Sequence, residues 1–566
     1  MPPSSDAMSP AKSRFLSHIF LLIAVASGFV LRVYMWESRA VVIENEGGGY
    51  ARQADNLRNG RTFEGIVPGA DVVETWLYPV LIAGTTLVTR NSEFATRLVS
   101  LVAGTCLIIP IYFLALRLYG RRTACIAACV VALHPLLIAL SVAGYTEGLN
   151  LTLMMAAIYC ALRMLDTNAG RSWLFAGIFL ALAYLNRTEL LAFVPLTIAA
   201  TFTVTLLNKE NLRNAALSSL KFLAVFAILA APYVVFLWVH TGQFRFEGKN
   251  LVNYTIGERE LAGMSPGEAS RGIDENLNVT GPLLDQNRFA TYSPYARTPR
   301  DILRYFLKMA GLKKYWVYRD VLTSFALGSL VLWIVAALGL FAAPWDRERF
   351  FREMFLIAVM VYFVVILLAA HATHERYTFS LLPIALSWFS RGLAALWDWA
   401  AQSVAAIQRR AILNPRMAGA AFAAIPLMLV LLSSASGTQD VNELQTARPL
   451  YLPLKRAGLW LKNQHPAPKN IFSSAVVAYY SGADQWLFPY SDGPLAVRYI
   501  RKINPDFLVI EPSAERNAPY LADWVENGIP DSQAVLVYQE RSPLGVTAIY
   551  RWQKTEGSPA DPAERH

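Results

Sequence analysis

The chain has 566 residues, of which 55% are hydrophobic and 16% charged, and it carries a formal net charge of +10. A soluble globular protein usually has about 25% charged residues, so this composition excludes a purely soluble protein. The apolar residues come in blocks of roughly 18 to 24, as membrane-crossing helices require, and not in the alternating segments of about 10 residues typical of a transmembrane β-barrel. The sequence therefore predicts an α-helical polytopic membrane protein.

Eleven apolar blocks are predicted to cross the membrane. They cover residues 15–36, 94–116, 123–141, 147–162, 172–185, 190–207, 217–239, 323–343, 354–370, 377–397 and 417–434. With the N-terminus inside, sixteen Lys and Arg residues fall in the short inner segments, and only Arg187 and Arg376 fall in the short outer turns. Because basic residues collect in cytoplasmic loops, this asymmetry predicts a cytoplasmic N-terminus and an extracytoplasmic C-terminal region, and it accounts for the net charge without a nucleic-acid partner.

Three outer segments are longer than connectors need to be: residues 37–93, 240–322 and 435–566. Loops beyond about 15 residues in a compact domain are usually functional, so function is expected on the outer face. We therefore divide the chain into a transmembrane domain, residues 1–434, and a soluble extracytoplasmic domain, residues 435–566.

The first outer loop opens with Glu46 followed by three glycines and Tyr50. Glycines permit positive φ and close approach of a ligand, which would place the Glu46 carboxylate beside open space. A solvated loop acid is the alternative. Farther along the loop, residues 50–58 predict a short helix ending at Gly60, and residues 76–89 an apolar helix too short to cross the membrane.

The second outer loop contains an amphipathic pattern. Ile302, Leu303 and Phe306 lie on one helical face, and a rim that includes Lys313 and Lys314 lies beside it. Such a helix is expected to rest among lipid headgroups. It would serve either as a membrane-anchored connection to the eighth span or as a binding site for a lipid phosphate.

The segment after the last span predicts a small α/β domain. Helices are expected over 452–462 and 495–503, and strands over 471–480, 507–511, 534–538 and 547–552. It contains no glycine-rich phosphate loop, nucleophile elbow or metal spacing. It would either cover the membrane site or bind an acceptor, and the sequence leaves both roles open.

Other charged residues gather at outer span ends. Glu147 begins the fourth span, and Arg187 lies between the fifth and sixth spans. Between the ninth and tenth spans the outer turn holds His371, His374, Glu375 and Arg376. A carboxylate near apolar surroundings is costly unless it has a role. For each residue an interfacial salt bridge is the alternative, and Arg187 has a local partner in Glu189.

No confident metal site follows from the sequence. His371 and His374 are three residues apart beside Glu375, but catalytic zinc motifs need helix-face spacing and a third ligand. The four cysteines all fall inside predicted spans, so neither a disulfide framework nor a zinc spacing is present.

Several motifs together resemble the GT-C superfamily of membrane glycosyltransferases. Glu46 lies four residues before Tyr50, as in the first loop of bacterial relatives of protein O-mannosyltransferases and of the lipid A aminoarabinose transferase. The remaining matches are Ala54, Leu57 and Gly60, Leu77-Tyr78-Pro79, Ala95-Thr96-Arg97-Leu98, Thr146-Glu147, Leu185-Asn186-Arg187-Thr188-Glu189 and Glu375-Arg376-Tyr377 before Leu382-Pro383. The resemblance covers roughly residues 15–400. Members usually have aspartate at the position of Glu46, often a second acid at Gly47, and proline at Trp76.

The resemblance implies the GT-C fold and transfer of a sugar from a polyprenyl-phosphate carrier to an acceptor hydroxyl on a lipid, glycan or protein at the outer face. Glu46 would be the catalytic base of an inverting reaction. Arg376 would bind the carrier phosphate through its planar fork, and Arg187, Lys313 and Lys314 would share that negative charge.

The remaining predicted site residues would surround the sugar and the acceptor. Glu147 would hold sugar hydroxyls, orient an arginine or help bind a divalent cation, the one cofactor that the resemblance leaves open. The resemblance places three further residues beside Glu147, near the sugar or the acceptor: Tyr50, His374 and Glu375. By analogy with the bacterial relatives, the membrane would be the bacterial inner membrane.

Two other classes of protein remain as alternatives. A transporter or flippase of a lipid-linked molecule would place its charges near the bilayer midplane, often in repeated halves, whereas the acids here lie at outer span ends and no repeat is visible. A non-catalytic membrane receptor, with the C-terminal domain as its working part, is the second alternative.

Overall fold

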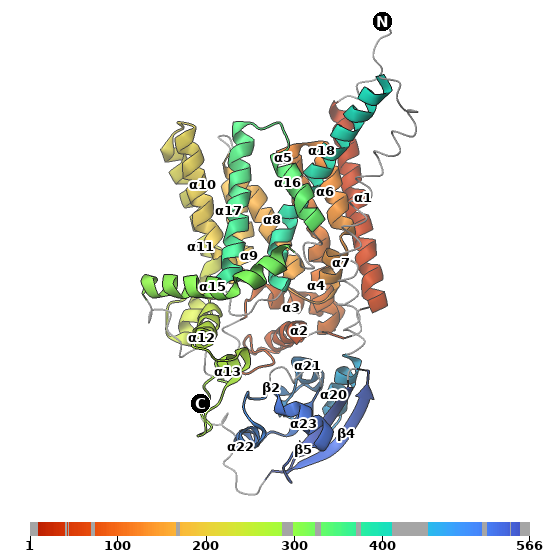
Figure 1. The fold of residues 1–566 in the computed structure, drawn as a ribbon, viewed down its shortest axis with the longest axis vertical. Helices are drawn as coiled ribbons and strands as arrows, with labels where there is room; N and C mark the ends of the chain where they lie inside the picture. Colours follow the sequence, from red (N-terminus) through yellow and green to blue (C-terminus); the bar gives the residue numbers. More distant parts are fainter. Residues whose placement is uncertain are drawn as a thin grey trace.

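The computed structural model describes residues 10–39, 42–43, 45–69, 74–165, 170–285, 298–322, 330–369, 375–409, 451–511, 518–543 and 545–554. A bundle of roughly parallel helices forms one part, and a small domain with a β-sheet forms the other (Figure 1). The side of the bundle that faces this domain is called the domain-facing end below.

Six helical segments of the described chain are long and apolar enough to cross a membrane. They are built from α1 (Pro10–Arg39), α4 and α5 (Ser92–Cys106 and Ile108–Tyr119), η1 and α10 (Thr188–Ala192 and Phe193–Leu207), α11 (Leu212–Thr241), α17 (Arg347–Ala369), and η4 with α18 (Glu375–Leu381 and Leu382–Arg409). This confirms a polytopic helical membrane protein.

A bent pair of helices counts as a seventh span if it crosses as one. The pair consists of α6 (Arg121–Leu133) and α7 (Pro135–Val142), which meet at 52°. His134 between them is extended, with φ −64° and ψ 115°, because a residue before proline is driven out of the helical region.

The total of eleven spans stays a prediction. Helices α9 (Ser172–Asn186) and α16 (Leu330–Phe341) coincide with expected spans, but with 15 and 12 residues they are short for a membrane-crossing helix. Helix α8 (Glu147–Met164) coincides with another, and the last expected span, 417–434, lies outside the described residues.

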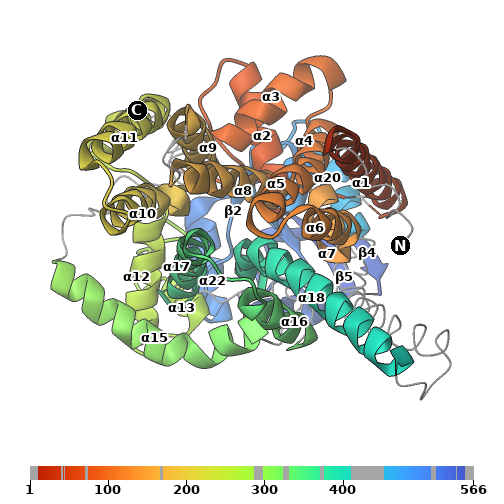
Figure 2. The ribbon, with the colours of Figure 1, turned by 90° about the horizontal axis from the view of Figure 1, so that it is seen from above.

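Seen from above, α5 and α8 lie near the middle of the bundle, whereas α1, α11 and α15 lie at its edge (Figure 2). Most residues of α8 are buried, among them Glu147 at its first position. The fourth predicted span is thus an interior helix that carries a carboxylate at its domain-facing end.

Two helices of the first predicted outer loop lie between the bundle and the small domain (Figure 1). Helix α2 (Asn45–Arg58) begins five residues earlier than expected, so that Glu46 lies in its first turn. Helix α3 (Leu77–Thr89) matches the expected short apolar helix.

The predicted amphipathic helix of the second long loop is α15 (Pro299–Leu322), which lies across the bundle axis (Figure 1). It exposes Leu303, Leu307 and Tyr315. Tyr305 anchors it by donating a hydrogen bond to the carbonyl of Ala369, at 3.2 Å. Helices α12 (Asn250–Leu261) and α13 (Pro266–Arg271) precede it.

The small domain is a five-stranded sheet with helices packed on it. In chain order its elements are α20 (Leu452–Lys462), β1 (Asn470–Phe472), α21 (Ala475–Ser481), β2 (Asp484–Trp486), α22 (Gly493–Ile503), β3 (Phe507–Ile510), α23 (Tyr520–Asn527), β4 (Ala534–Ser542) and β5 (Gly545–Trp552). The strand order is β2-β1-β3-β5-β4. Strand β1 pairs in parallel with β2 and β3, and β5 pairs antiparallel with β3 and β4.

The expected strand over 471–480 is wrong. Only its first two residues belong to β1, and the chain then forms α21, with Val476, Val477 and Tyr480 buried. A short continuous apolar run fits a buried helix as well as a buried strand, so periodicity alone does not separate them. This error matters because α21 packs against α2.

Candidate functional site

Two turns at the domain-facing end of the bundle lie side by side. The side-chain amide of Asn186 donates to the carbonyl of Thr146 at 3.4 Å, and Thr75 donates to the carbonyl of Asn186 at 2.7 Å. The first turn leads into α8, and the second joins α9 to η1. Residues from three parts of the chain therefore meet here.

An ion-pair triad joins these turns. Arg187 Nη1 lies 3.6 Å from Glu147 Oε1, and Arg187 Nε lies 3.1 Å from Glu189 Oε1. The Glu147 side chain is 2% exposed and that of Arg187 is 19% exposed. A buried carboxylate is unfavourable unless it is paired, so the ion pair with Arg187 compensates for the burial of Glu147. Arg187 makes both the local pair with Glu189 and a contact with Glu147 at the start of α8.

The triad carries one positive and two negative charges. Arg187 therefore already has two carboxylate partners, and its expected role in binding the carrier phosphate stays a prediction. Among the described residues there is no group of three or more His, Cys, Asp or Glu side chains that could hold a metal ion.

Two buried amide oxygens lie close to the triad in sequence. Asn150 follows Glu147 by three positions on α8, so both lie on the same helical face, and Asn186 precedes Arg187 directly. Both asparagines are 1% exposed. Their Oδ1 atoms have no hydrogen-bond partner in the described part of the chain. Buried acceptors are normally satisfied, which makes these atoms candidates for hydroxyl groups of a ligand.

Glu46 is exposed in the first turn of α2. A Cβ atom on the next residue, Gly47, would lie 2.9 Å from the carbonyl oxygen of Gly144. Gly144 itself has a φ of +79° in the turn that leads to Glu147. The close contact of the two glycines brings the start of α2 against the turn before the triad, and it leaves no room for a side chain at Gly47.

The glycines after Glu46 differ from the expectation. All three lie in a helix with ordinary φ values, so they serve close packing and not a positive-φ loop. A Cβ at Gly48 would lie 3.2 Å from Tyr479 Cβ in the small domain, and one at Gly49 would lie 3.7 Å from Glu74 Oε1. Packed atoms, and not open space, therefore surround Gly47 and Gly48, while the Glu46 side chain is exposed.

Tyr50 connects the first turns of α2 to α3. Its ring packs edge-on against Tyr78, with centroids 5.1 Å apart. The buried Tyr78 hydroxyl donates to the carbonyl of Thr96 at 3.1 Å. Three of the motifs that carry the family resemblance therefore pack together.

Trp76, the other departure from the family pattern, joins an aromatic cluster. It stacks on Phe63 with centroids 4.5 Å apart and meets Phe236 and Tyr233 of α11 edge-on. Sequence patterns gave no sign of this cluster, because its members come from three separate segments. It fixes the first loop to α11 next to Thr75.

The two predicted lysines lie on α15. Lys313 Nζ forms an ion pair with Glu260 Oε2 of α12 at 3.1 Å, and the side chains are 13% and 7% exposed. Lys314 is exposed on the same helix. The contact of Lys313 favours a structural role in joining α15 to α12.

The third predicted hairpin is described in part. Glu375 and Arg376 begin η4, which packs against α15, α17 and α18. The side chains of these two residues and the whole of His374 lie outside the described structure. Whether they meet Glu46 therefore stays a prediction.

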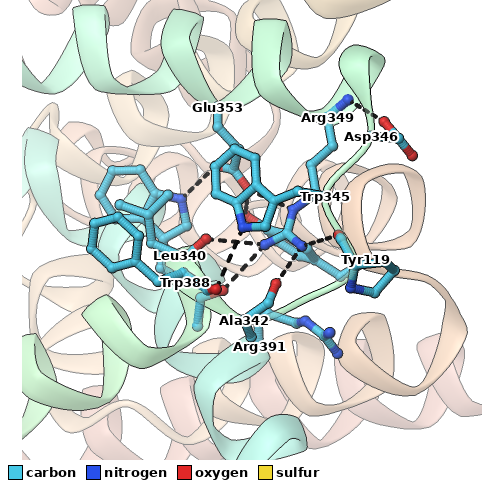
Figure 3. Close-up of polar contacts among 12 residues, drawn as sticks. Tyr119, Leu340, Ala342, Trp345, Asp346, Arg349, Glu353, Trp388 and Arg391 are labelled. Atoms are coloured by element: carbon cyan, nitrogen blue, oxygen red, sulfur yellow. Dashed lines mark hydrogen bonds and ion pairs between the residues drawn. The ribbon is translucent and has the colours of Figure 1, made fainter.

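A second buried charge cluster, near the start of α17, differs in kind (Figure 3). Glu353 is 0% exposed and accepts hydrogen bonds from Tyr119 at 2.7 Å and from Trp388 at 2.9 Å. Arg349 Nε lies 3.4 Å from Glu353, and its Nη1 donates to the carbonyl of Ala342 at 2.6 Å. The pair is neutral and hydrogen-bonded on both sides, as expected of a structural network.

Comparisons with known proteins find one matching family model and several similar solved structures. Residues 74–238 match the family model described as dolichyl-phosphate-mannose-protein mannosyltransferase. This segment contains the triad but neither Glu46 nor Arg376. No protein of curated function matches the sequence significantly.

Solved structures extend the likeness over the whole chain. The Archaeoglobus fulgidus oligosaccharyltransferase in its apo form matches with a TM-score of 0.60 at 14% identity, over 96% of this chain and 75% of that one. The archaeal oligosaccharyltransferase AglB from Archaeoglobus fulgidus, in complex with an inhibitory peptide and a dolichol-phosphate, matches with a TM-score of 0.57 at 14% identity. This match covers 97% of the present chain and 75% of AglB.

Two further structures have similar scores. ArnT from Cupriavidus metallidurans bound to undecaprenyl phosphate matches with a TM-score of 0.51 at 13% identity, over 96% of this chain and 98% of that one. The arabinofuranosyltransferase AftD from Mycobacteria matches with a TM-score of 0.52 at 14% identity. This match covers 98% of the present chain but 40% of the AftD chain. The chain is an integral membrane protein with the fold of GT-C glycosyltransferases, as the sequence motifs predicted.

Proposed function

We propose that the protein is a membrane glycosyltransferase that moves a sugar from a polyprenyl-phosphate carrier to an acceptor hydroxyl on a lipid, glycan or protein, with inversion. The observation that carries this proposal is the position of Glu46, an exposed carboxylate whose helix start packs on the turn before the Glu147 triad. The fold and the family match over residues 74–238 support it. ArnT and AglB are seen with undecaprenyl phosphate and dolichol-phosphate, respectively.

The chemistry needs one base and one anion site. The acceptor oxygen attacks the anomeric carbon while Glu46 takes its proton, and the bond from that carbon to the carrier phosphate breaks on the opposite side. The phosphate leaves as a stable anion, so no general acid is needed. Arg376 would hold this phosphate, because a planar guanidinium binds phosphate oxygens in pairs. Lys314 would add positive charge from α15.

The triad would bind the sugar. Arg187 fixes the orientation of Glu147, and the Oδ1 atoms of Asn150 and Asn186 are buried acceptors. Sugar hydroxyls are donors that would satisfy such acceptors in a site of low dielectric constant.

We also propose that the domain-facing end of the bundle is the outer side of the membrane. The distribution of Lys and Arg in short loops supports this orientation. The N-terminus would then be cytoplasmic, and residues 435–566 would be extracytoplasmic, in a bacterial inner membrane.

The experiment that tests the proposal uses purified full-length protein in liposomes with a panel of polyprenyl-phosphate sugars. Release of one sugar, with formation of the free carrier phosphate and inverted configuration in the product, is expected. Carriers that all remain intact, with and without added divalent cations and acceptor extracts, would contradict it. Movement of an intact carrier between leaflets would instead indicate the transporter.

A further inference from the structure

Two consecutive tyrosines of the small domain contact the chain on both sides of Glu46. The Tyr480 hydroxyl accepts a hydrogen bond from the backbone N–H of Ile43 at 3.1 Å. Tyr479 packs against Gly48, where a Cβ atom would lie 3.2 Å from Tyr479 Cβ. The backbone is thus held three residues before Glu46 and two residues after it.

The contact of Tyr480 is buried and tied to charged groups. Ile43 is 0% exposed and precedes the helix, so its N–H has no helical partner and depends on this hydroxyl. Tyr480 donates in turn to Glu93 Oε1 at 2.9 Å. The same oxygen lies 2.7 Å from Arg97 and 3.7 Å from Lys455. Hydrogen bonds to a fixed carboxylate are stronger than neutral ones, so this anchor is rigid.

Tyr479 is tied to the membrane part through a second chain of hydrogen bonds. Its hydroxyl lies 3.1 Å from Ser92 Oγ, and Ser92 donates to Asp55 Oδ2 of α2 at 2.8 Å. Arg52, also on α2, donates to the carbonyl of Ala478 at 3.0 Å. Helix α21 therefore follows α2 from its first turn to its third.

The tyrosines keep their protons under any ordinary assay condition. Burial raises the pKa of Tyr479 to about 12 and raises the pKa of Tyr480 well above its usual range. Tyr480 consequently remains a donor to Glu93 and an acceptor from Ile43 at neutral pH.

We infer that Tyr479 and Tyr480 are positioning residues for Glu46, so that the small domain completes the active site by fixing the first turn of α2. The inference rests on the proposed role of Glu46 as the base. Displacing a reacting group by about 1 Å can lower a rate about a hundredfold. The sequence left two roles open for this domain, which are to cover the membrane site or to bind the acceptor. The contacts of α21 with α2 favour the first role.

The test compares Tyr480→Phe with wild type in the liposome assay and by hydrogen–deuterium exchange of the full-length protein. The variant keeps the ring and loses both hydrogen bonds. We expect kcat to fall about tenfold to a hundredfold while KM for the donor changes less than about twofold. Exchange at residues 42–50 should rise about tenfold, because one buried hydrogen bond to the backbone is gone. Gly48→Ala places a Cβ atom against Tyr479. It should likewise lower kcat and raise exchange at residues 42–50.

Tyr538→Phe is the matched control, since the hydroxyl of Tyr538 bonds to Glu540 within the same domain, at 2.8 Å. It should leave turnover and exchange at residues 42–50 unchanged. Unchanged exchange in Tyr480→Phe would overturn the inference, whatever its turnover. If wild type uses no donor but exchange rises in Tyr480→Phe alone, the proposed function fails and the positioning contact stands.

Discussion

Arg187 Nη1 lies 3.6 Å from Glu147 Oε1, and this contact joins the turn before α8 to the turn after α9. Because Glu147 is almost fully buried, Arg187 stabilises the folded protein and also fixes the orientation of the Glu147 carboxylate.

Replacing Arg187 by alanine should both destabilise and inactivate the protein. Glu147 would be left as a buried carboxylate without its arginine, which costs about 3 kcal/mol of unfolding free energy. Arg187→Lys should retain the charge and part of the activity. Thermal unfolding in detergent and donor turnover would measure these effects. Arg122→Ala is the control, because its pair with Asp398 is about half exposed and should contribute at most about 1 kcal/mol. Equal effects of the two alanine variants would contradict the prediction.

Gly47→Ala should displace the start of α2. The new Cβ would lie 2.9 Å from a backbone oxygen that cannot move away cheaply. We expect a loss of about 1 to 3 kcal/mol, as in other overpacked sites, together with lower turnover. Gly84→Ala serves as the control, since a Cβ there meets nothing within 4 Å and alanine favours the helix. Wild-type turnover in Gly47→Ala would show that the contact with Gly144 does not position Glu46.

Glu353→Ala should destabilise without changing catalysis. Removal of the carboxylate leaves Arg349 buried without its counter-ion, which costs about 3 to 5 kcal/mol. Turnover per folded molecule should stay at the wild-type value, because the cluster surrounds the start of α17, at the end of the bundle away from the small domain (Figure 1). Glu348→Ala, at a side chain that is 76% exposed, should change neither quantity. A fall of kcat in folded Glu353→Ala would assign this cluster a catalytic role.

Lys313 and Arg376 should differ in their effects on donor binding. Lys313→Met breaks the pair with Glu260 and should lower the unfolding temperature while KM for the donor changes less than about twofold. Arg376→Ala should raise that KM at least about tenfold, since it removes a bidentate phosphate contact. A raised KM in Lys313→Met, together with an unchanged KM in Arg376→Ala, would place the carrier phosphate at Lys313.

The sequence predicted the fold class because apolar blocks and basic loops report directly on the membrane. It also placed Glu147 and Arg187 at the same end of their spans, but their contact with each other is a finding of the structure. The helix over 452–462 was predicted correctly because its apolar positions have a helical period.

The contacts with α21 escaped prediction for physical reasons. Val476 to Tyr480 form a short buried run whose periodicity does not distinguish helix from strand. The glycines after Glu46 have a role in packing that depends on Gly144 and Tyr479, both far away in the sequence. Only the tertiary structure brings these residues together.

The most direct test of the central claim is the comparison of Glu46→Gln with wild type on the donor identified in liposomes, with donor binding measured in parallel. Glutamine has nearly the same shape but cannot take the acceptor proton. We predict unchanged donor binding and a kcat lowered about a hundredfold to ten-thousandfold, the usual contribution of a general base. Wild-type turnover in Glu46→Gln would contradict the assignment of Glu46 as the base and make Glu147 the next residue to replace.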